Sequence, residues 1–557
     1  MNTFNILTTL FFTLCCIIRQ FLRNKEIKSR NLLSIIEEYK HITIAIIFLI
    51  GVVVRFYKLD QLPAGMHYDE VSIAYDTFCL MNYGVDRNLK PYSIYLISHG
   101  SGQNVLLLYL ITISFRIFGT YGLWAIRFPT AAMGALSVLL IFFIVKKFFN
   151  NAMAIISALL MAIFPALINM SRFGLESYLM YSFLLLSTLM FIIAIQKQKA
   201  IYYFIAGLCY GTTLYTYAIA YMVIPVILTL SILYLLYFRK IKLTHIISMG
   251  IPVFILALPL MLMLAVNNNM ISADIIPFYV PVMNYYRGGE VHFQSLQSII
   301  TGITKIFTFD DMTYNSHTIF KTMYMCSIPL TIYGGIIYIL DFIKHIVKKE
   351  YTTESIVMFS FLASFAVIFL IDYANVNKMN AVYPFFCILI ALALYKIGEK
   401  SDILLVLMLM VYMVNFTAFT IDYFDDSKYT FIQKHFSSTM DEPLSKIESL
   451  NNNAEKVYVC DSIGDGKIEF LSYAIKSHPE EFFYNEPTGS IDKYTINLPV
   501  WLDSENVLHE DINDRYIYMV QKDNMTETFI YIRNMLDENN FIKDSTTYYD
   551  IYYKNAN

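Results

Sequence analysis

Eleven long apolar stretches run through this sequence and constrain its fold more than any other feature. Such stretches suit helices that cross a hydrocarbon layer about 30 Å thick, which takes about 20 residues. They lie near residues 40–56, 122–145, 151–168, 178–195, 200–217, 219–237, 243–265, 320–340, 354–372, 380–396 and 402–420. The chain is 57% hydrophobic and only 15% charged, whereas ordinary soluble domains contain about 25% charged residues. We therefore expect an α-helical, multi-pass protein of the cell membrane.

A twelfth apolar stretch, residues 105–118, is shorter and carries Arg116 near its end, so it could cross the membrane or lie flat in its interface. The short loops decide between these options, because cytoplasmic loops carry an excess of Lys and Arg. If 105–118 lies flat, the basic short loops all fall on one side. Their basic residues are Lys146, Lys147, Lys197, Lys199, Arg239, Lys240, Lys242, Lys344, Lys348, Lys349, Lys396 and Lys400. A crossing would move all of them outside, so we predict a flat segment and about 11 spans.

This topology divides the chain into parts. Residues 1–39 form an N-terminal cytoplasmic or anchor segment, in which the apolar run 5–18 could be an extra anchor or an embedded helix. Residues 40–421 form the transmembrane domain, and two long loops, 57–121 and 266–319, lie outside the cytoplasm. Long loops escape the charge rule, so the basic residues in them do not contradict this arrangement.

The tail, residues 422–557, differs in being polar and rich in turns. It contains strand-like runs at Lys456–Cys460 and Arg515–Gln521 and a helix-like stretch at Thr528–Leu536. These patterns predict a small extracytoplasmic α/β domain.

Charge and cysteine content exclude several classes of protein. The net charge is −3, so no basic excess points to nucleic acid. The seven cysteines include no CxxC pair, and most lie in apolar runs. We therefore expect neither a structural metal cluster nor a disulfide framework.

An acidic pair opens the first long loop, where His67 is followed closely by Asp69 and Glu70. Adjacent carboxylates at a bilayer surface are costly unless they are solvated, paired or used. One interpretation is a solvated first helical turn, where acidic residues are favoured. The other is that Asp69 is a general base, Glu70 orients it or binds a nearby charge, and His67 contacts substrate.

Basic residues at two other predicted outer turns are candidates for binding a lipid phosphate. Arg172 and Glu176 are spaced i, i+4, so on a helix they would share a face. The pair could be an interfacial ion pair, or Arg172 could bind a phosphate and Glu176 the substrate. Lys378 could anchor at the interface or neutralise a phosphate.

Asp310, Asp311 and Asn315 lie in the second long loop. They could bind a sugar or a cation, although a hydrated loop is the plainer interpretation. A divalent metal is possible between Asp69, Glu70 and Asp310, but no ligand spacing requires one. The identity of any metal is therefore open.

Taken in order, four elements make the chain resemble the protein O-mannosyltransferase-like family, glycosyltransferase family 39 of the GT-C superfamily. The elements are the Asp69-Glu70 pair, YGVDRNLKP at Tyr83–Pro91, IFGTYGLWAIRFPTAAMGAL at Ile117–Leu136, and SRFGLE at Ser171–Glu176. The similarity covers roughly residues 40–240.

The resemblance implies a GT-C fold with interfacial helices in the first loop and an inverting transfer from a polyprenyl-phosphate sugar, with Asp69 as base. It also implies basic residues at the lipid phosphate, for which Arg172, Lys378 and Arg127 are candidates. No nucleotide fingerprint is present, which argues against a nucleotide-sugar donor, and no cofactor is required. The tail has no evident β-trefoil-like insert, so the acceptor could be a cell-surface glycan, a lipid or a protein.

Two other functions remain open at this point. A transporter would carry ionisable residues inside its spans, which here are almost free of charge. A non-catalytic assembly or polymerisation partner for cell-surface glycans would tolerate replacement of Asp69. The frequent Lys, Ile and Asn residues suggest a bacterial source.

Overall fold

The fold is known from a computed structural model. It describes residues 2–21, 32–98, 101–283, 287–308, 317–425, 440–450, 454–460, 467–485, 489–496, 500–502, 508–510, 512–522 and 526–554.

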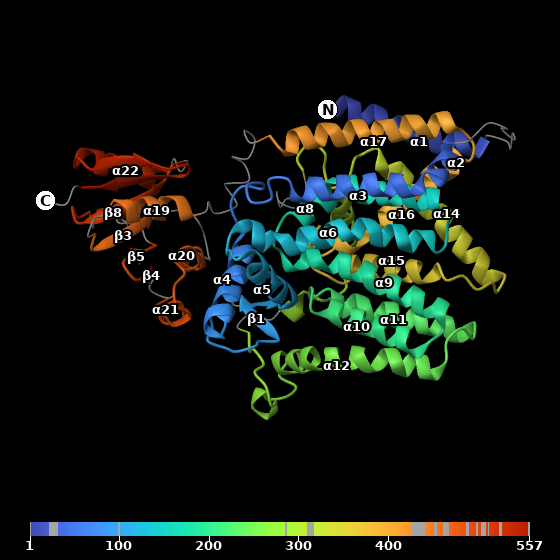
Figure 1. The fold of residues 1–557 in the computed structure, drawn as a ribbon, viewed down its shortest axis with the longest axis horizontal. Helices are drawn as coiled ribbons and strands as arrows, with labels where there is room; N and C mark the ends of the chain where they lie inside the picture. Colours follow the sequence, from blue (N-terminus) through green and yellow to red (C-terminus); the bar gives the residue numbers. More distant parts are fainter. Residues whose placement is uncertain are drawn as a thin grey trace.

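Helices occupy all the predicted spans and form one bundle (Figure 1). They are α3 (Lys40–Phe56), α6 (Leu123–Lys146), α7 (Asn151–Ile163) with α8 (Pro165–Ser171), η1 (Glu176–Leu179) with α9 (Met180–Lys197), α10 (Ala200–Leu214), α11 (Ala220–Tyr237), α12 (Leu243–Asn267), α14 (Ser327–Val347), α15 (Ser355–Ala366) with η4 (Val367–Phe369), η5 (Asn380–Val382) with α16 (Tyr383–Gly398), and α17 (Asp402–Tyr423). Among the described residues, seven helices are long and apolar enough to cross a membrane, or up to nine if each of two bent pairs is one span. The shorter α10 and α15 lie in the same bundle. The chain is thus a multi-pass α-helical membrane protein.

One span is broken where α7 meets α8, which are bent by 60°. Phe164 is extended and Pro165 begins α8, because proline cannot continue the helix that precedes it. The buried Arg55 lies at this break. Its guanidinium donates to the carbonyls of Ala162 at 3.2 Å and Met161 at 2.9 Å, so the break is stabilised inside the bundle.

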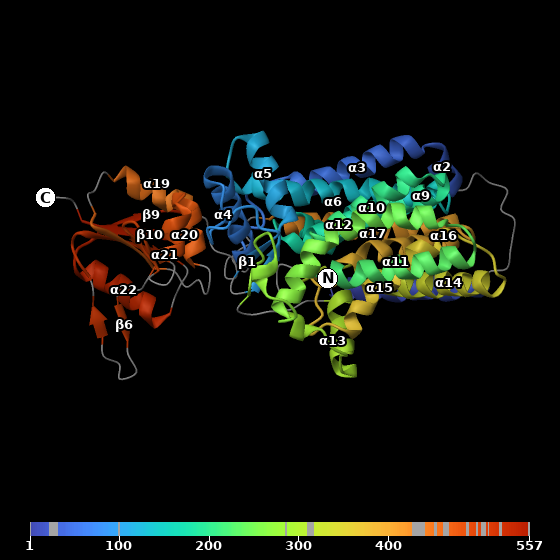
Figure 2. The same cartoon turned by 90° about the horizontal axis from the view of Figure 1, so that it is seen from below.

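The first long loop forms two helices that lie at one end of the bundle. They are α4 (Tyr68–Tyr83) and α5 (Leu106–Phe118), with a hairpin of β1 (Tyr95–Ser98) and β2 (Ser101–Asn104) between them. Figures 1 and 2 show α5 inclined steeply to the long helices, as the charge argument for 105–118 predicts. We call this end of the bundle the loop end.

The basic short loops lie at the opposite end (Figure 1). This is where α6, α9, α11, α14 and α16 finish and where α2 (Leu32–Glu38) turns into α3 at 86°. The segregation of basic loops from long loops is thus a property of the fold.

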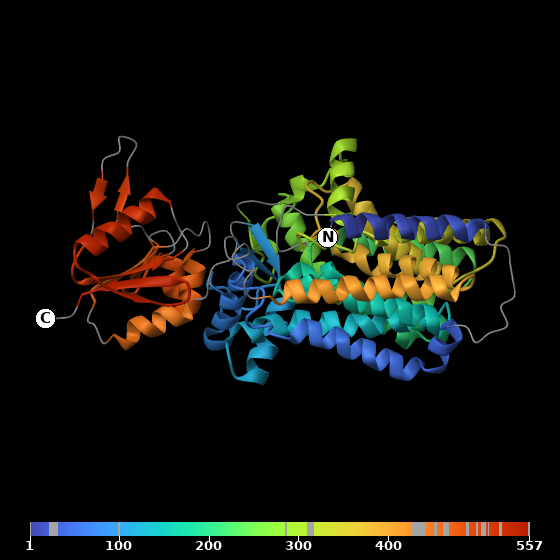
Figure 3. The same cartoon turned by 90° about the horizontal axis from the view of Figure 1, so that it is seen from above.

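The N-terminal apolar run forms α1 (Asn2–Phe21), which lies alongside the long helices (Figure 3). It packs against α14, α16 and α17, and the ring of Phe12 meets that of Tyr412 edge-on at 5.7 Å. A course along the bundle favours the extra anchor over an embedded helix at the cytoplasmic end.

The second long loop contributes short elements at the loop end. They are η2 (Ala273–Ile275), η3 (Arg287–Glu290) and α13 (Leu296–Phe307), and Figure 2 shows α13 projecting to the side of the bundle.

The tail is a small α/β domain, as predicted. Its elements are α19 (Asp441–Ser449), β3 (Lys456–Cys460), α20 (Lys467–Ile475), α21 (Pro479–Asn485), β4 (Ser490–Ile491), β5 (Tyr494–Thr495), β6 (Val500–Leu502), β7 (Leu508–Glu510), β8 (Tyr516–Gln521), α22 (Glu527–Glu538), β9 (Ile542–Ser545) and β10 (Tyr549–Tyr553). A six-stranded sheet has the order β4-β5-β3-β8-β10-β9, in which β3 is parallel to both neighbours. The predicted strands and helix correspond to β3, β8 and α22.

Alternating residues of β3 face opposite sides of this sheet, as a strand requires. Tyr458 and Cys460 pack in a core with Ile532 of α22. Val457 and Val459 belong to the core on the other face, which continues through α20 into the α4 region. The domain is therefore covered on one face by its own helix and is joined to the bundle through the other.

The tail domain docks on the loop end through α20 and the residues that follow it. The hydroxyls of Tyr75 on α4 and Ser477 lie 2.9 Å apart, and the Tyr473 hydroxyl donates to the Tyr121 carbonyl. The rings of Tyr75 and Phe482 are 5.4 Å apart. The domain is thus packed directly on α4.

Cysteine labelling tests the two-ended arrangement. Lys147 and Asp60 are both exposed but lie at opposite ends of the bundle. In intact cells, a membrane-impermeant maleimide should label Asp60→Cys and leave Lys147→Cys unlabelled. The wild type is the background, because six of its seven cysteines are buried and Cys209 is partly buried. The opposite labelling pattern would invert the topology.

Candidate functional site

The acidic pair lies in the first turn of α4, which begins with a capping box formed by His67 and Glu70. The His67 ring accepts a hydrogen bond from the Asp69 backbone N–H at 3.1 Å, and Glu70 Oε2 accepts one from the His67 backbone N–H at 3.0 Å. Both donors at the start of a helix would otherwise be unsatisfied. The sequence thus fixes the start of α4 locally.

Glu70 is fully buried and paired with Arg127 of α6. Arg127 Nε lies 2.9 Å from Oε1 and Nη2 lies 3.1 Å from Oε2, and the Gly174 backbone N–H also donates to Oε1 at 2.6 Å. Burial alone would raise the pKa of Glu70, but the Arg127 charge and the hydrogen bonds outweigh it and hold the pKa below its ordinary value. Glu70 therefore remains a charged brace for α4.

The remaining donors of Arg127 go to backbone carbonyls. Nη1 donates to Leu59 at 3.2 Å and Pro63 at 2.8 Å, and Nη2 donates to Gly65 at 2.7 Å. With Glu70 included, every N–H of this buried guanidinium has a protein acceptor. The structure gives Arg127 a role in holding the loop before α4, and a phosphate could bind only by displacing these bonds.

Asp69 differs from Glu70 in being partly open to solvent. Its side chain is 37% exposed, and Oδ2 lies 3.5 Å from His67 Nδ1. Because that ring nitrogen accepts from the Asp69 N–H, it carries no proton to share with the carboxylate. A rigid backbone thus presents a partly exposed carboxylate, which suits a base.

Arg172 and Glu176 do not share a helix face, so this expectation is wrong. Helix α8 ends at Ser171 and η1 begins at Glu176, and the residues between them are not helical. The buried Arg172 guanidinium donates to the carbonyls of Val54 at 2.9 Å and Leu62 at 2.8 Å. It secures the end of α3 and the loop that follows.

Glu176 lies in a buried polar cluster under the β1–β2 hairpin. Its carboxylate accepts from the Asn104 backbone N–H, and the Asn104 side-chain oxygen accepts from Tyr221 at 2.6 Å. Gln103 and Asn104 are 3% and 0% exposed. In the described part of the chain, Gln103 Oε1 and Asn104 Nδ2 have no hydrogen-bond partner. In the sequence, the polar stretch HGSGQN at residues 99–104 is the signal that could have indicated this cluster, and nothing in it points to Tyr221.

Lys378 is held in the loop before η5. Its ammonium lies 2.8 Å from Glu290 Oε2 and 2.8 Å from the Asp372 carbonyl. The pair joins the second long loop to the segment before α16. Lys378 is less buried than the arginines, with 14% of its side chain exposed.

A second buried ion pair joins α4 to the loop that follows it. Arg87 Nη2 lies 3.4 Å from Asp76 Oδ2, and the Arg87 backbone N–H donates to Oδ1 at 3.0 Å. Nearby, burial raises the pKa of Asp86, even though its carboxylate accepts from Ser93 and two backbone N–H groups. The YGVDRNLKP stretch thus builds a turn against α4.

Asp310, Asp311 and Asn315 lie outside the described residues. Within the described part of the chain, no three His, Cys, Asp or Glu side chains are grouped so that they could hold a metal ion.

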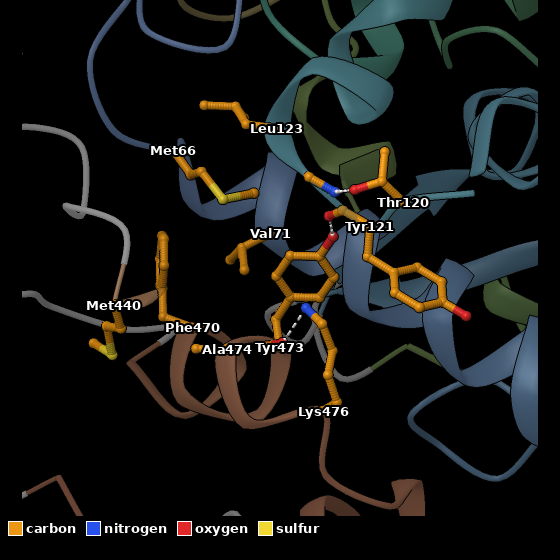
Figure 4. Close-up of a pocket in the computed structure, with 11 residues that line it drawn as sticks. Met66, Val71, Thr120, Tyr121, Leu123, Met440, Phe470, Tyr473, Ala474 and Lys476 are labelled. Atoms are coloured by element: carbon orange, nitrogen blue, oxygen red, sulfur yellow. Dashed lines mark hydrogen bonds between the residues drawn. The ribbon is translucent and has the colours of Figure 1, made fainter. Parts of the chain in front are cut away.

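A cavity of about 340 Å³ lies between α4, the start of α6 and the tail domain (Figure 4). Its lining residues come from both domains and are Met66, Val71, Thr120, Tyr121, Gly122, Leu123, Met440, Phe470, Tyr473, Ala474 and Lys476. Met66 and Val71 flank Asp69 in the sequence, so the cavity adjoins the start of α4.

Comparison with known proteins agrees with the resemblance found in the sequence. Residues 103–263 match the family model described as dolichyl-phosphate-mannose-protein mannosyltransferase. A protein of Bacillus subtilis (strain 168) named "Putative mannosyltransferase YkcB" is 35% identical over 121 residues. This match covers 21% of the chain and 16% of the relative.

The solved structures of ArnT share the fold at low sequence identity. ArnT from Cupriavidus metallidurans in the apo state has a TM-score of 0.53 and 9% identity, over 92% of this chain and 98% of ArnT. The same protein bound to undecaprenyl phosphate has a TM-score of 0.51 and 10% identity, with the same coverage. The Archaeoglobus fulgidus oligosaccharyltransferase has a TM-score of 0.46 and 14% identity, over 78% of this chain and 61% of that protein.

The fold class is therefore that of a GT-C membrane protein with a small C-terminal α/β domain, as the sequence predicted. Within it, the resemblance to the protein O-mannosyltransferase-like family is confirmed by the match over residues 103–263.

Replacing Glu70 tests its role as a brace. Glu70→Gln should leave the buried Arg127 charge uncompensated, which typically costs about 3–5 kcal/mol. We expect a clearly lower midpoint of thermal unfolding in detergent for Glu70→Gln, and a midpoint near wild type for Asp69→Asn.

The difference in thermal midpoint between wild type and Glu70→Gln should depend on pH in one direction. Since the folded-state pKa of Glu70 lies below its unfolded value, the stabilisation is present at neutral pH and is lost as pH falls below about 4.3. The wild-type advantage over Glu70→Gln should shrink in that range. Equal midpoints at pH 7 would contradict the brace.

Proposed function

We propose that the protein is a membrane glycosyltransferase that moves a sugar from a polyprenyl-phosphate carrier to an extracytoplasmic acceptor, with Asp69 as the base. The observation that carries this proposal is the contrast between two adjacent carboxylates. Glu70 is buried and fully hydrogen-bonded, whereas Asp69 is fixed by the same helix start but 37% exposed.

The transfer is a single displacement with inversion. The acceptor hydroxyl oxygen attacks the anomeric carbon of the donor sugar, and Asp69 takes the hydroxyl proton. The bond between that carbon and the phosphate oxygen breaks, and the polyprenyl phosphate leaves with its electron pair. A positioned base contributes about 10²–10⁴-fold to such a step.

Positioning matters here because the donor is already activated. The phosphate leaving group removes the need for a nucleotide, so the protein has to hold the base, the acceptor and the phosphate in register. The capping box and the Glu70–Arg127 pair hold the base. The ArnT structure bound to undecaprenyl phosphate supports a carrier of this kind.

The phosphate needs a cation at the membrane surface, and Lys378 is the best placed of the candidates. Its ammonium is held by one carboxylate and one carbonyl, and part of the side chain is exposed. If a phosphate oxygen took the place of the Glu290 carboxylate, the Lys378 ammonium would still have an anionic partner. Arg172 and Arg127 would have to give up carbonyls that stabilise loops.

The Glu176 cluster suits the sugar of the donor. Asn104, Gln103 and Glu176 offer amide and carboxylate groups, of which two amide atoms have no partner among the described residues. Sugar hydroxyls are donors and acceptors that pair with such groups. With the basic short loops in the cytoplasm, the loop end and these groups face the outside.

Turnover of a radiolabelled undecaprenyl-phosphate hexose by purified protein in lipid tests the proposal. Asp69→Asn should lower sugar transfer or release by about 10²-fold or more, because the amide cannot accept the proton. Asp60→Asn is the matched control, since Asp60 is an exposed carboxylate of the same loop and should leave turnover unchanged.

Equal turnover in wild type and Asp69→Asn would place the base elsewhere. Absence of turnover with every polyprenyl-phosphate sugar would instead favour a non-catalytic partner in glycan assembly.

A further inference from the structure

The cavity between the tail domain and the start of α4 offers a ligand site that the donor does not need. It is bounded by α20 on one side, where Phe470 and Tyr473 lie, and by Met66 and Val71 on the other (Figure 4). Its volume of about 340 Å³ falls in the range of small-molecule sites. Neither domain forms it alone.

We propose that this cavity binds the acceptor and that the acceptor is an anionic saccharide. The inference rests on the proposed glycosyltransferase function and names its second substrate. Met66 and Val71 lie within three residues of Asp69 in the sequence, so the cavity adjoins the helix start that carries the proposed base.

Aromatic rings supply the part of the site that suits a saccharide. Phe470 and Tyr473 both line the cavity from α20. Sugar rings present apolar C–H faces that pack on such surfaces, while hydroxyls at the edge remain hydrogen-bonded. The Tyr473 hydroxyl is already fixed on the Tyr121 carbonyl, so the ring has a defined orientation before any ligand arrives.

A single cation supplies the charge preference. Lys476 is the only charged residue among the described residues that line the cavity. Its ammonium lies 3.5 Å from the centre of the Tyr473 ring and 5.8 Å from the centres of the Phe78 and Tyr121 rings. Apolar surroundings strengthen the attraction of this charge for an anion, and the lining residues that the structure describes include no carboxylate to oppose it.

The start of α6 adds to the same preference. Gly122 is the N-cap residue of this helix and has no side chain with which to cap the first N–H groups. The positive end of the helix dipole therefore meets the cavity wall beside Leu123. A carboxylate or phosphate on the saccharide is stabilised by both features.

Binding is measured without a donor, by titration calorimetry on the full-length protein in lipid nanodiscs. The probes are hyaluronan hexasaccharide, which carries carboxylates, and the neutral chitohexaose. We expect hyaluronan hexasaccharide to bind at least tenfold more tightly than chitohexaose. Failure of the acidic probe to bind, or equal affinity for both probes, would overturn the proposal.

Two lysine variants give a matched comparison. Lys476→Gln should weaken binding of the acidic probe about tenfold or more, and Lys476→Arg should retain most of it. Lys493→Gln is the control, because Lys493 also lies near a tyrosine ring of the tail domain, that of Tyr494 at 5.6 Å, but does not line the cavity. Equal effects of Lys476→Gln and Lys493→Gln would also refute the site.

A third variant addresses the aromatic surface. Phe470→Ala should weaken both probes, while Asp60→Asn, at an exposed carboxylate that does not line the cavity, should bind them as wild type does. Binding that persists when no turnover can be detected would reject the glycosyltransferase and keep the cavity as a saccharide site. Turnover without Lys476-dependent binding would keep the glycosyltransferase and reject the cavity as the saccharide site.

Discussion

The buried ion pair between Glu70 and Arg127 is the interaction on which the loop end depends. It joins α4 to α6 across 57 residues of sequence, and through Gly174 it also fixes the turn after α8. Burying each charge costs several kcal/mol unless partners satisfy it. Here carbonyls and N–H groups complete both side chains, so the pair is tolerated and the loop has one arrangement. The position of Asp69 is a consequence, because it directly precedes Glu70 in the first turn of the same helix.

Two further arginines follow the same principle. Arg55 takes the carbonyls freed at the break between α7 and α8, and Arg172 takes those of the loop after α3. The two lie together, since Arg55 Nε donates to Ser171 Oγ at 3.0 Å. Non-helical backbone near lipid is stable only when protein groups satisfy it. The guanidinium groups of these arginines are therefore engaged by backbone carbonyls, which leaves Lys378 as the candidate best suited to a lipid phosphate.

Local pattern was enough to predict the elements but not their long-range partners. Hydropathy located the spans and the short 105–118 helix, and alternation located β3 and β8, because burial acts directly on these periods. The capping box of His67 and Glu70 is also local. In contrast, nothing in the sequence paired Glu70 with Arg127 or Asn104 with Tyr221, which is 117 residues away. The prediction that Arg172 and Glu176 share a helix face was wrong because the chain between Ser171 and Glu176 is not helical.

The tail domain belongs to the loop end physically, since one hydrophobic core contains residues of both. Val71 and Phe78 of α4 pack in the same cluster as Leu471 of α20 and Ile517 of β8. Separating the domains would expose that core to water at about 25 cal/mol for each Å² of apolar surface. A tether alone would allow the domain to move freely, whereas a shared core fixes the cavity wall that α20 contributes. The start of α4 is then held by the ion pair of Glu70 with Arg127 and by the packing of Val71 in the core that it shares with the tail domain.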